Sequence, residues 1–389
     1  MQFMPMAARL AARTAVSHAV NQTLAMLIAA FTAGIVAGLG GSAVTGEEPV
    51  VSRIAFGSCI KQDQPTPIWD AVIETNPQLF VFLGDNIYGD TLDIQLLRQK
   101  YSQLADQPGL RRLKQTCRIL GTWDDHDYGQ DDVGAEYPRK RESQQAFLDF
   151  FAVPPDDPRR TQEGVYSSQV VGPPGKRIQL ILLDGRYFRS PLKTGFKPGE
   201  PGDGYRGKYM PNLDPDSTLL GAAQWRWLEG QLRVPAELRI IGSGIQILAD
   251  EHGSEKWENF PHERQRLLDL IRTSGASGVV LLSGDRHLAE IARLPTASPG
   301  TVGYPLYEVT SSSMNAPSGN ITKAGARFAN EINAYRIGLT FFEVNFGAVL
   351  VDWKAADPVV RLQVRDEKGA VVLQQRFPLS QLRSPQAKP

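Results

Sequence analysis

Five short segments of this chain carry side chains that bind metals or move protons, and each follows an apolar run. They are Gly57-Ser58-Cys59, Gly84-Asp85-Asn86-Ile87-Tyr88, Trp123-Asp124-Asp125-His126-Asp127, Asp184-Gly185-Arg186 and Gly284-Asp285-Arg286-His287. A single aspartate after a glycine is most often a turn or helix-cap residue. The recurrence of these residue types after successive apolar runs instead indicates one site assembled from several loops.

Carboxylate, phenolate and imidazole groups are donors that hold metal ions. Two ions close together suit the hydrolysis of phosphate esters, because the ester oxygens repel a nucleophile unless positive charge is concentrated beside them. One carboxylate must bridge the two ions, and we expect Asp85 to do so. Tyr88 is three residues further on, and a phenolate favours ferric iron over zinc or magnesium; the alternative is a tyrosine of the core.

Three further residues are candidates for catalysis. His126 follows one aspartate and precedes another, so we expect it to donate a proton or stabilise charge while Asp127 orients it. The alternative is a structural histidine. Arg186 offers planar, bidentate contact to phosphate oxygens, whereas its neighbour Asp184 would reduce it to a salt bridge.

The cysteines and the remaining histidines leave alternatives open. Cys59 and Cys117 would form a disulfide in an oxidising compartment, but the position of Cys59 after a strand-like run favours a metal ligand. Cys117 is expected to be a buried thiol. His252 and His262 lie in a polar stretch and are expected at the surface, and the loops at 246–250 and 311–313 are expected near the site.

Short β-branched runs alternate with longer amphipathic stretches from residue 51 onward, which predicts the α/β class. Predicted strands end at Phe56, Leu83, Trp123, Leu183, Gly242 and Leu282, and predicted helices cover 67–75 and 94–104. In open α/β sheets ligands bind beyond the carboxyl ends of strands, where these loops would collect. Residues 341–346, 348–353, 359–364 and 370–377 predict antiparallel strands that complete a sheet, and 191–215 predicts a long loop bordering the site.

The chain resembles the alkaline phosphatase D (PhoD-like) family of the calcineurin-like metallophosphatase superfamily from about residue 52 to the C-terminus. The resemblance rests on Gly57-Ser58-Cys59, Gly84-Asp85 with Tyr88, Trp123 to Asp127, Asp184 with Arg186, Leu220-Gly221 with Gln224-Trp225, and Ser283 to His287. It implies a four-layer α/β/β/α sandwich of two mixed β-sheets flanked by helices. It also implies a site with Fe³⁺ and Ca²⁺.

The resemblance assigns the ligands by position. Cys59, Asp85, Tyr88 and His287 would hold the iron, and Asp85, Asp125 and Asp285 would hold the calcium. Carboxylates stand where many metallophosphatases have nitrogen ligands, and this substitution suits a harder ion such as calcium.

Residues 1–46 contain Arg9 and Arg13, no acid, and a weakly polar run from Leu24 to Leu39 followed by small residues. This pattern predicts a Sec-type signal peptide, an exported protein in the periplasm or outside the cell, and a catalytic domain over 47–389. An uncleaved anchor is the alternative, but the run is shorter than the ~20 residues that a spanning helix needs. Lys plus Arg and Asp plus Glu both number 42, so no net field favours nucleic acid. We expect a monomer.

The expected function is hydrolysis of phosphate monoesters or diesters by in-line attack of a metal-held hydroxide. One alternative is a phospholipase D-like diesterase that acts on lipid headgroups, since the same metal site serves either leaving group. The other is a secreted binding protein without catalysis, which would require the ligand residues to be missing or dispersed.

Overall fold

The computed structural model describes residues 48–195, 208–296, 300–318, 328 and 331–383. The predicted signal peptide and Arg206 of the predicted bordering loop lie outside these residues. Residues Glu48–Pro389 form one compact unit. None of the helices in the described ranges is long and apolar enough to cross a membrane.

The first sheet has six strands and joins the beginning of the unit to its end. Its order is β15 (Val371–Pro378), β14 (Val359–Asp366), β13 (Asn345–Asp352), β1 (Arg53–Gly57), β2 (Leu79–Leu83) and β3 (Arg118–Thr122). Strands β1, β2 and β3 are parallel, whereas β13 pairs with β1 antiparallel. The C-terminal meander therefore completes this sheet, as predicted.

The second sheet has seven strands from the middle of the chain. Its order is β12 (Arg336–Phe341), β10 (Ala289–Leu294), β11 (Leu306–Ser311), β9 (Val279–Ser283), β8 (Leu238–Ser243), β5 (Ile178–Leu182) and β4 (Ser167–Val171). The central pairs β11–β9, β9–β8 and β8–β5 are parallel and the outer pairs are antiparallel. A two-stranded ribbon, β6 (Lys193–Thr194) with β7 (Tyr209–Met210), lies apart from both sheets.

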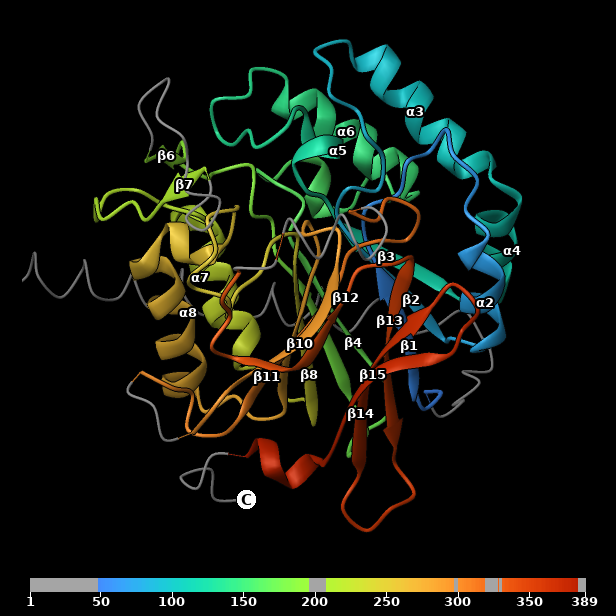
Figure 1. The fold of residues 1–389 in the computed structure, drawn as a ribbon, viewed down its shortest axis with the longest axis vertical. Coiled ribbons are helices and arrows are strands. Elements are labelled where there is room, and N and C mark those ends of the chain that lie inside the picture. The colour runs from blue at the N-terminus through green and yellow to red at the C-terminus, as the bar shows by residue number, and fades with distance from the viewer. Residues whose placement is uncertain (1–47, 196–207, 297–299, 319–327, 329–330, 384–389) are drawn as a thin grey trace, which may run out of the picture. The chain divides into compact units, whose positions relative to one another are not determined.

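Helices cover the outer face of each sheet (Figure 1). Those beside the first sheet are α2 (Ile68–Glu74), α3 (Ile94–Asp106), α4 (Pro108–Thr116), α5 (Asp125–Tyr128) and α6 (Lys140–Phe150); those beside the second are α7 (Gly221–Leu232) and α8 (Pro261–Ser274). Alternation along β2 divides its side chains between two cores: Val81 packs between the sheets, and Phe80 and Phe82 pack under the helices. The rings of Phe80 and Phe82 lie 5.5 and 6.0 Å from that of Trp69 on α2. The predicted four-layer α/β/β/α sandwich is confirmed.

One predicted strand is wrong. Residues 341–346 were expected to form a single strand, but Phe341 ends β12 in the second sheet and Asn345 begins β13 in the first. The chain passes from one sheet to the other between these residues. The alternation of apolar and polar residues over 342–346 is typical of a single strand, so it does not show that the chain changes sheets there.

Candidate metal centre

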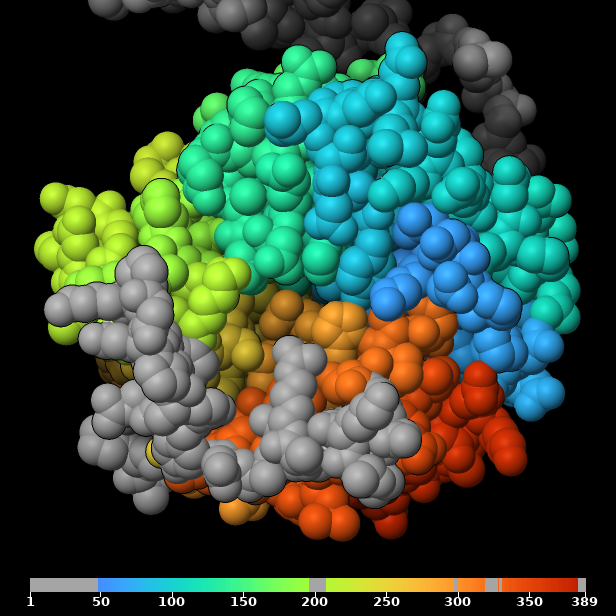
Figure 2. Space-filling view, turned by 45° about the horizontal axis from the view of Figure 1, so that its top comes forward, coloured from blue at the N-terminus to red at the C-terminus, as the bar shows by residue number. Residues whose placement is uncertain are grey.

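The predicted site loops meet at the carboxyl ends of β1, β2, β3 and β9, and backbone hydrogen bonds tie them together. The amide of Ile60 donates to the carbonyl of Asp85 at 2.9 Å, and the amide of Gly284 donates to the carbonyl of Gly244 at 2.8 Å. In Figure 2, segments of the first half of the chain, blue to green, meet segments of the second half, yellow to orange, on this face. The site therefore draws its residues from both sheets.

Two glycines allow the loops to approach this closely. A Cβ on Gly84, whose φ is +94°, would lie 2.4 Å from the Cβ of Asp124. A Cβ on Gly284 would lie 2.6 Å from the Oγ of Ser58. Any larger residue at either position would push the strand ends apart.

Four of the predicted ligands have left-handed backbone conformations, which non-glycine residues rarely adopt. The φ angles are +61° at Cys59, +50° at Asp85, +69° at Asp285 and +54° at His287. Each such residue costs of order 1–3 kcal/mol and persists only where the surrounding structure imposes it. Four residues of one cluster share this backbone strain. This indicates that the directions in which their side chains point matter for function.

The first cluster contains the residues that the family resemblance assigns to iron. Ligand atoms of Cys59, Asp85 and His287 lie within 4.8 Å of one another. Cys59 Sγ donates to Asp85 Oδ2 at 3.4 Å, and the hydroxyl of Tyr88 lies 3.3 Å from His287 Nε2. Ser312, in the loop predicted to reach the site, has its Oγ 3.1 Å from Cys59 Sγ.

The second cluster contains the residues assigned to calcium and shares Asp85 with the first. Ligand atoms of Asp85, Asp125 and His126 lie within 4.8 Å of one another, as do those of Asp124, Asp125 and Asp285. Asp85 and Asp125 therefore connect neighbouring groups. All six predicted ligands converge, which is the opposite of the dispersal that a non-catalytic binding protein would require.

The donor set fits bound cations. Asp85 Oδ1 and Asp124 Oδ2 are buried and have no hydrogen-bond partner in the described part of the chain. A buried acceptor without a partner costs about 1–3 kcal/mol. Bound cations beside these oxygens would remove that cost and offset the repulsion among the clustered carboxylates.

The pKa values report the same crowding of negative charge. Burial, and then repulsion from Asp125, raise the pKa of Asp85 well above its usual range and that of Asp285 to about 8. Burial would also raise the pKa of Asp125, but Arg186 and then His126 outweigh it and lower this pKa to about 2. Asp125 is thus the carboxylate held most firmly in its charged form.

His126 is oriented by Asp90, which corrects the role predicted for Asp127. His126 Nδ1 lies 2.7 Å from Asp90 Oδ1, and its ring packs on that of Tyr88 with centroids 4.3 Å apart. Burial alone would lower the pKa of His126, but the bond to Asp90 and the nearby carboxylates Asp85 and Asp125 raise it to about 11.

Asp127 instead fixes the loops that carry the predicted ligands. Its Oδ1 accepts from the amides of Asp85 at 3.1 Å and Asp124 at 2.7 Å, and its Oδ2 accepts from Asn86 Nδ2 at 2.5 Å. Asp127 is the third residue of the short helix α5, and its bond to the amide of Asp124, the N-cap residue, is one half of a capping box. Asp127 therefore acts on the position of Asp85.

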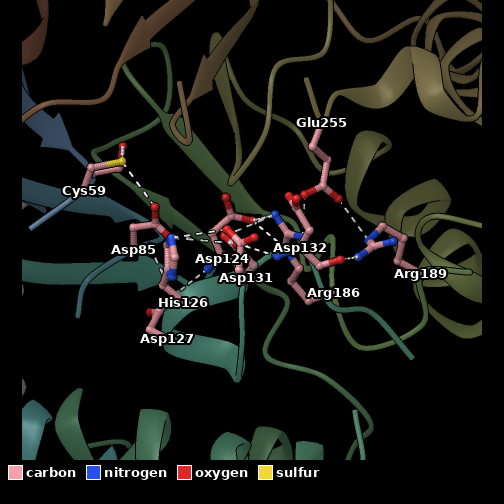
Figure 3. Close-up of polar contacts among 12 residues, drawn as sticks. Cys59, Asp85, Asp124, His126, Asp127, Asp131, Asp132, Arg186, Arg189 and Glu255 are labelled. Atoms are coloured by element: carbon pink, nitrogen blue, oxygen red, sulfur yellow. Dashed lines mark hydrogen bonds and ion pairs between the residues drawn. The ribbon is translucent and has the colours of Figure 1, made fainter. Parts of the chain in front are cut away.

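Arg186 lies at the base of the site and contacts carboxylates (Figure 3). Its Nε donates to Asp124 Oδ1 at 2.6 Å, and its Nη1 donates to Glu255 Oε2 at 2.7 Å. Asp184, the expected partner, accepts the backbone amide of Arg186 at 2.9 Å instead. Arg189 Nε lies 3.1 Å from Glu255 Oε1, so both guanidinium groups share this buried glutamate.

A cavity of about 460 Å³ opens beside the second cluster. Its wall includes the predicted residues Asp125, His126, Asp285 and His287. It also includes residues that the sequence did not single out, namely Asp131, Asp132, Gly253, Ser254, Glu255, Phe328 and Glu331. Lys208 and Tyr209 line it as well, so the described end of the predicted loop at 191–215 does border the site.

The burial predicted for three other residues, His252, His262 and Cys117, needs correction. His252 was expected at the surface, but it is 3% exposed and its Nε2 lies 3.0 Å from Gln246 Oε1. His262 is half-buried, with Nε2 2.7 Å from the carbonyl oxygen of Ser217. Cys59 and Cys117 are both free, so the disulfide alternative is excluded, and Cys117 is half-buried where full burial was expected.

The two-sheet fold and the convergent donor cluster define an α/β protein with a site suited to metal ions. The chain belongs to the PhoD-like phosphatase family, whose sequence model matches residues 54–357. This confirms the resemblance seen in the sequence.

Two known proteins illustrate the relationship. Alkaline phosphatase D of Bacillus subtilis (strain 168) is 23% identical over 256 residues, which cover 60% of this chain and 42% of that protein. The match thus spans less than half the length of this curated relative. The solved structure described as "Structure of PhoD" aligns with a TM-score of 0.65 and 17% identity over 88% of this chain and 73% of that chain, which supports the fold.

Proposed function

We propose that this protein is an exported, metal-dependent phosphoesterase that hydrolyses phosphate monoesters or diesters. The observation that carries the proposal is the sharing of Asp85 between a Cys–His group and a carboxylate group, whose buried oxygens lack partners in the described chain. Membership of the PhoD-like phosphatase family supports the same reaction class. Export rests on the sequence pattern of residues 1–46.

We assign the ligands as the sequence suggests. Cys59, Asp85, Tyr88 and His287 would hold Fe³⁺, and Asp85, Asp125 and Asp285 would hold Ca²⁺, since a thiolate and a phenolate suit iron and carboxylates suit calcium. The geometry adds Asp124 as a neighbour of the second group. When bound, the two cations would neutralise phosphate oxygens and lower the pKa of a water molecule.

The protein's own groups would position the substrate and move the proton. Asp90 binds Nδ1 of His126, so Nε2 is the nitrogen left to face the cavity and to donate to the leaving-group oxygen. Arg186, held between Asp124 and Glu255, would act as a positioning residue that keeps Asp124 and Asp125 in place.

The test compares Asp85→Asn and His287→Ala with Asp106→Asn, which changes an exposed aspartate paired with Arg111. Turnover of a chromogenic phosphomonoester and a phosphodiester is expected to disappear in the first two variants and to persist in the third. Circular dichroism checks that all three are folded. Full activity of folded Asp85→Asn would refute the proposal, and the ratio of the two substrates gives the ester preference.

A further inference from the structure

Among the described residues, one lysine, Lys208, and one arginine, Arg286, line the cavity. Both side chains are positively charged near neutral pH. The Lys208 side chain is 57% exposed, and its Nζ is 2.8 Å from Asp132 and 3.9 Å from Asp131. Two carboxylates thus share this single ammonium group. Lys208 therefore offers little unneutralised charge to an anionic substrate.

Arg286 is placed differently. It stands between Asp285 and His287, and only 4% of its surface is exposed. Its Nη2 donates to Glu331 Oε2 at 2.6 Å, and its Cζ lies 5.5 Å from the centre of the Phe328 ring. Glu331 and Phe328 thus fix the guanidinium plane at the cavity wall.

Among the described residues, the guanidinium of Arg286 pairs with one carboxylate, whereas that of Arg186 pairs with three. An arginine has five N–H donors. The described chain provides Glu331 as the acceptor for Nη2, while the buried Nε has no hydrogen-bond partner. Arg186 contacts Asp124, Asp125 and Glu255 and does not line the cavity.

We propose that Arg286 is a catalytic residue that binds the phosphoryl oxygens of the substrate, the role that the sequence suggested for Arg186. This inference rests on the proposed phosphoesterase function. Glu331 is the positioning residue that holds one edge of the guanidinium, and Arg286 lines a cavity whose wall also includes His126. A planar donor pair beside the metal ligands matches two oxygens of a tetrahedral phosphate.

The test measures binding of inorganic phosphate, the reaction product, to the purified metal-containing protein by calorimetry. Arg286→Gln is expected to weaken binding about 10- to 100-fold, because a charge-assisted hydrogen-bond pair is lost, and Arg286→Lys to weaken it less. Arg272→Gln is the control. Arg272 pairs with Asp269 at 2.8 Å on α8 and does not line the cavity, so phosphate affinity is expected to stay within a few-fold.

The outcomes separate the two proposals. If Arg286→Gln and Arg286→Lys bind phosphate as tightly as the parent protein, the role of Arg286 is refuted, even when ester hydrolysis is observed. If phosphate binding depends on Arg286 but no ester is hydrolysed, the role of Arg286 stands and the proposed activity fails. A loss of thermal stability in Arg286→Gln with unchanged phosphate affinity would identify Arg286 as structural only.

Discussion

Nδ1 of His126 lies 2.7 Å from Oδ1 of Asp90, a residue 36 positions earlier in the chain. Asp90 itself has a left-handed backbone, with φ +46°. A carboxylate that binds one imidazole nitrogen fixes the ring and selects which nitrogen faces the substrate. Asp90 is therefore expected to control the proton donor without contacting the substrate.

Asp90→Asn is expected to lower kcat about 10-fold or more while KM changes little, since orienting partners of this kind are worth about 10- to 100-fold. Asparagine tolerates the left-handed backbone, so the loop is expected to remain intact. Steady-state kinetics against the parent protein measure the effect. Asp93→Asn, a change at the exposed cap of α3, is the control, and an equal loss of kcat there would contradict the role of Asp90.

Glu255→Gln is expected to lower the free energy of unfolding by about 3 kcal/mol, because it removes one charge from a buried pair and leaves Arg186 less compensated. Both side chains are buried, with 1% and 0% exposure. Urea denaturation of the metal-free protein, in the presence of a chelator, measures this change apart from metal binding.

The matched control for that change is Glu237→Gln. Glu237 pairs with Arg177 at 2.8 Å, but the two side chains are 20% and 29% exposed. A pair open to solvent contributes about 1 kcal/mol or less. If the two substitutions lower the free energy of unfolding equally, burial does not increase the contribution of the Arg186–Glu255 pair to stability.

The thiol of Cys117 is expected to react slowly with alkylating reagents at moderate pH. Burial raises its pKa from 9.0 to about 11, and the thiolate is the reactive form. The raised pKa of this acid keeps it protonated, so at pH 9 about one thiol in a hundred is ionised instead of about half. Alkylation rates at Cys117, followed by mass spectrometry from pH 8 to 11.5, should still rise above pH 10; a plateau at pH 9.5 would contradict the shift.

The sequence predicts most of the fold and the side chains that converge in the cluster, because both depend on local patterns. Apolar runs ending in Asp85 or Asp285 identify strands and their functional ends, and the structure brings these residues together. The passage between sheets at 341–345 was missed because Phe342, Glu343, Val344, Asn345 and Phe346 alternate apolar and polar residues, the pattern of one continuous strand. Prediction succeeds where a residue follows a strand and fails where the chain changes sheets.

The missed site residues share a different cause. Glu255 lies in a polar stretch far from any predicted strand, and its burial depends on pairing with Arg186 and Arg189. Asp90 follows a ligand loop, and no local pattern distinguishes it from Asp127 as the partner of His126. Both roles arise from contacts between distant segments, which a single sequence does not display.

Metal content per chain is the sharpest test of the proposal that Asp85 is shared by two unlike metal sites. Mass spectrometric analysis of the purified parent protein and three variants should find iron lost in His287→Ala, calcium lost in Asp285→Asn, and both lost in Asp85→Asn. This double loss is expected because Asp85 belongs to both groups of donor atoms. Asp85→Asn protein that retains iron and calcium at the parent level would contradict it.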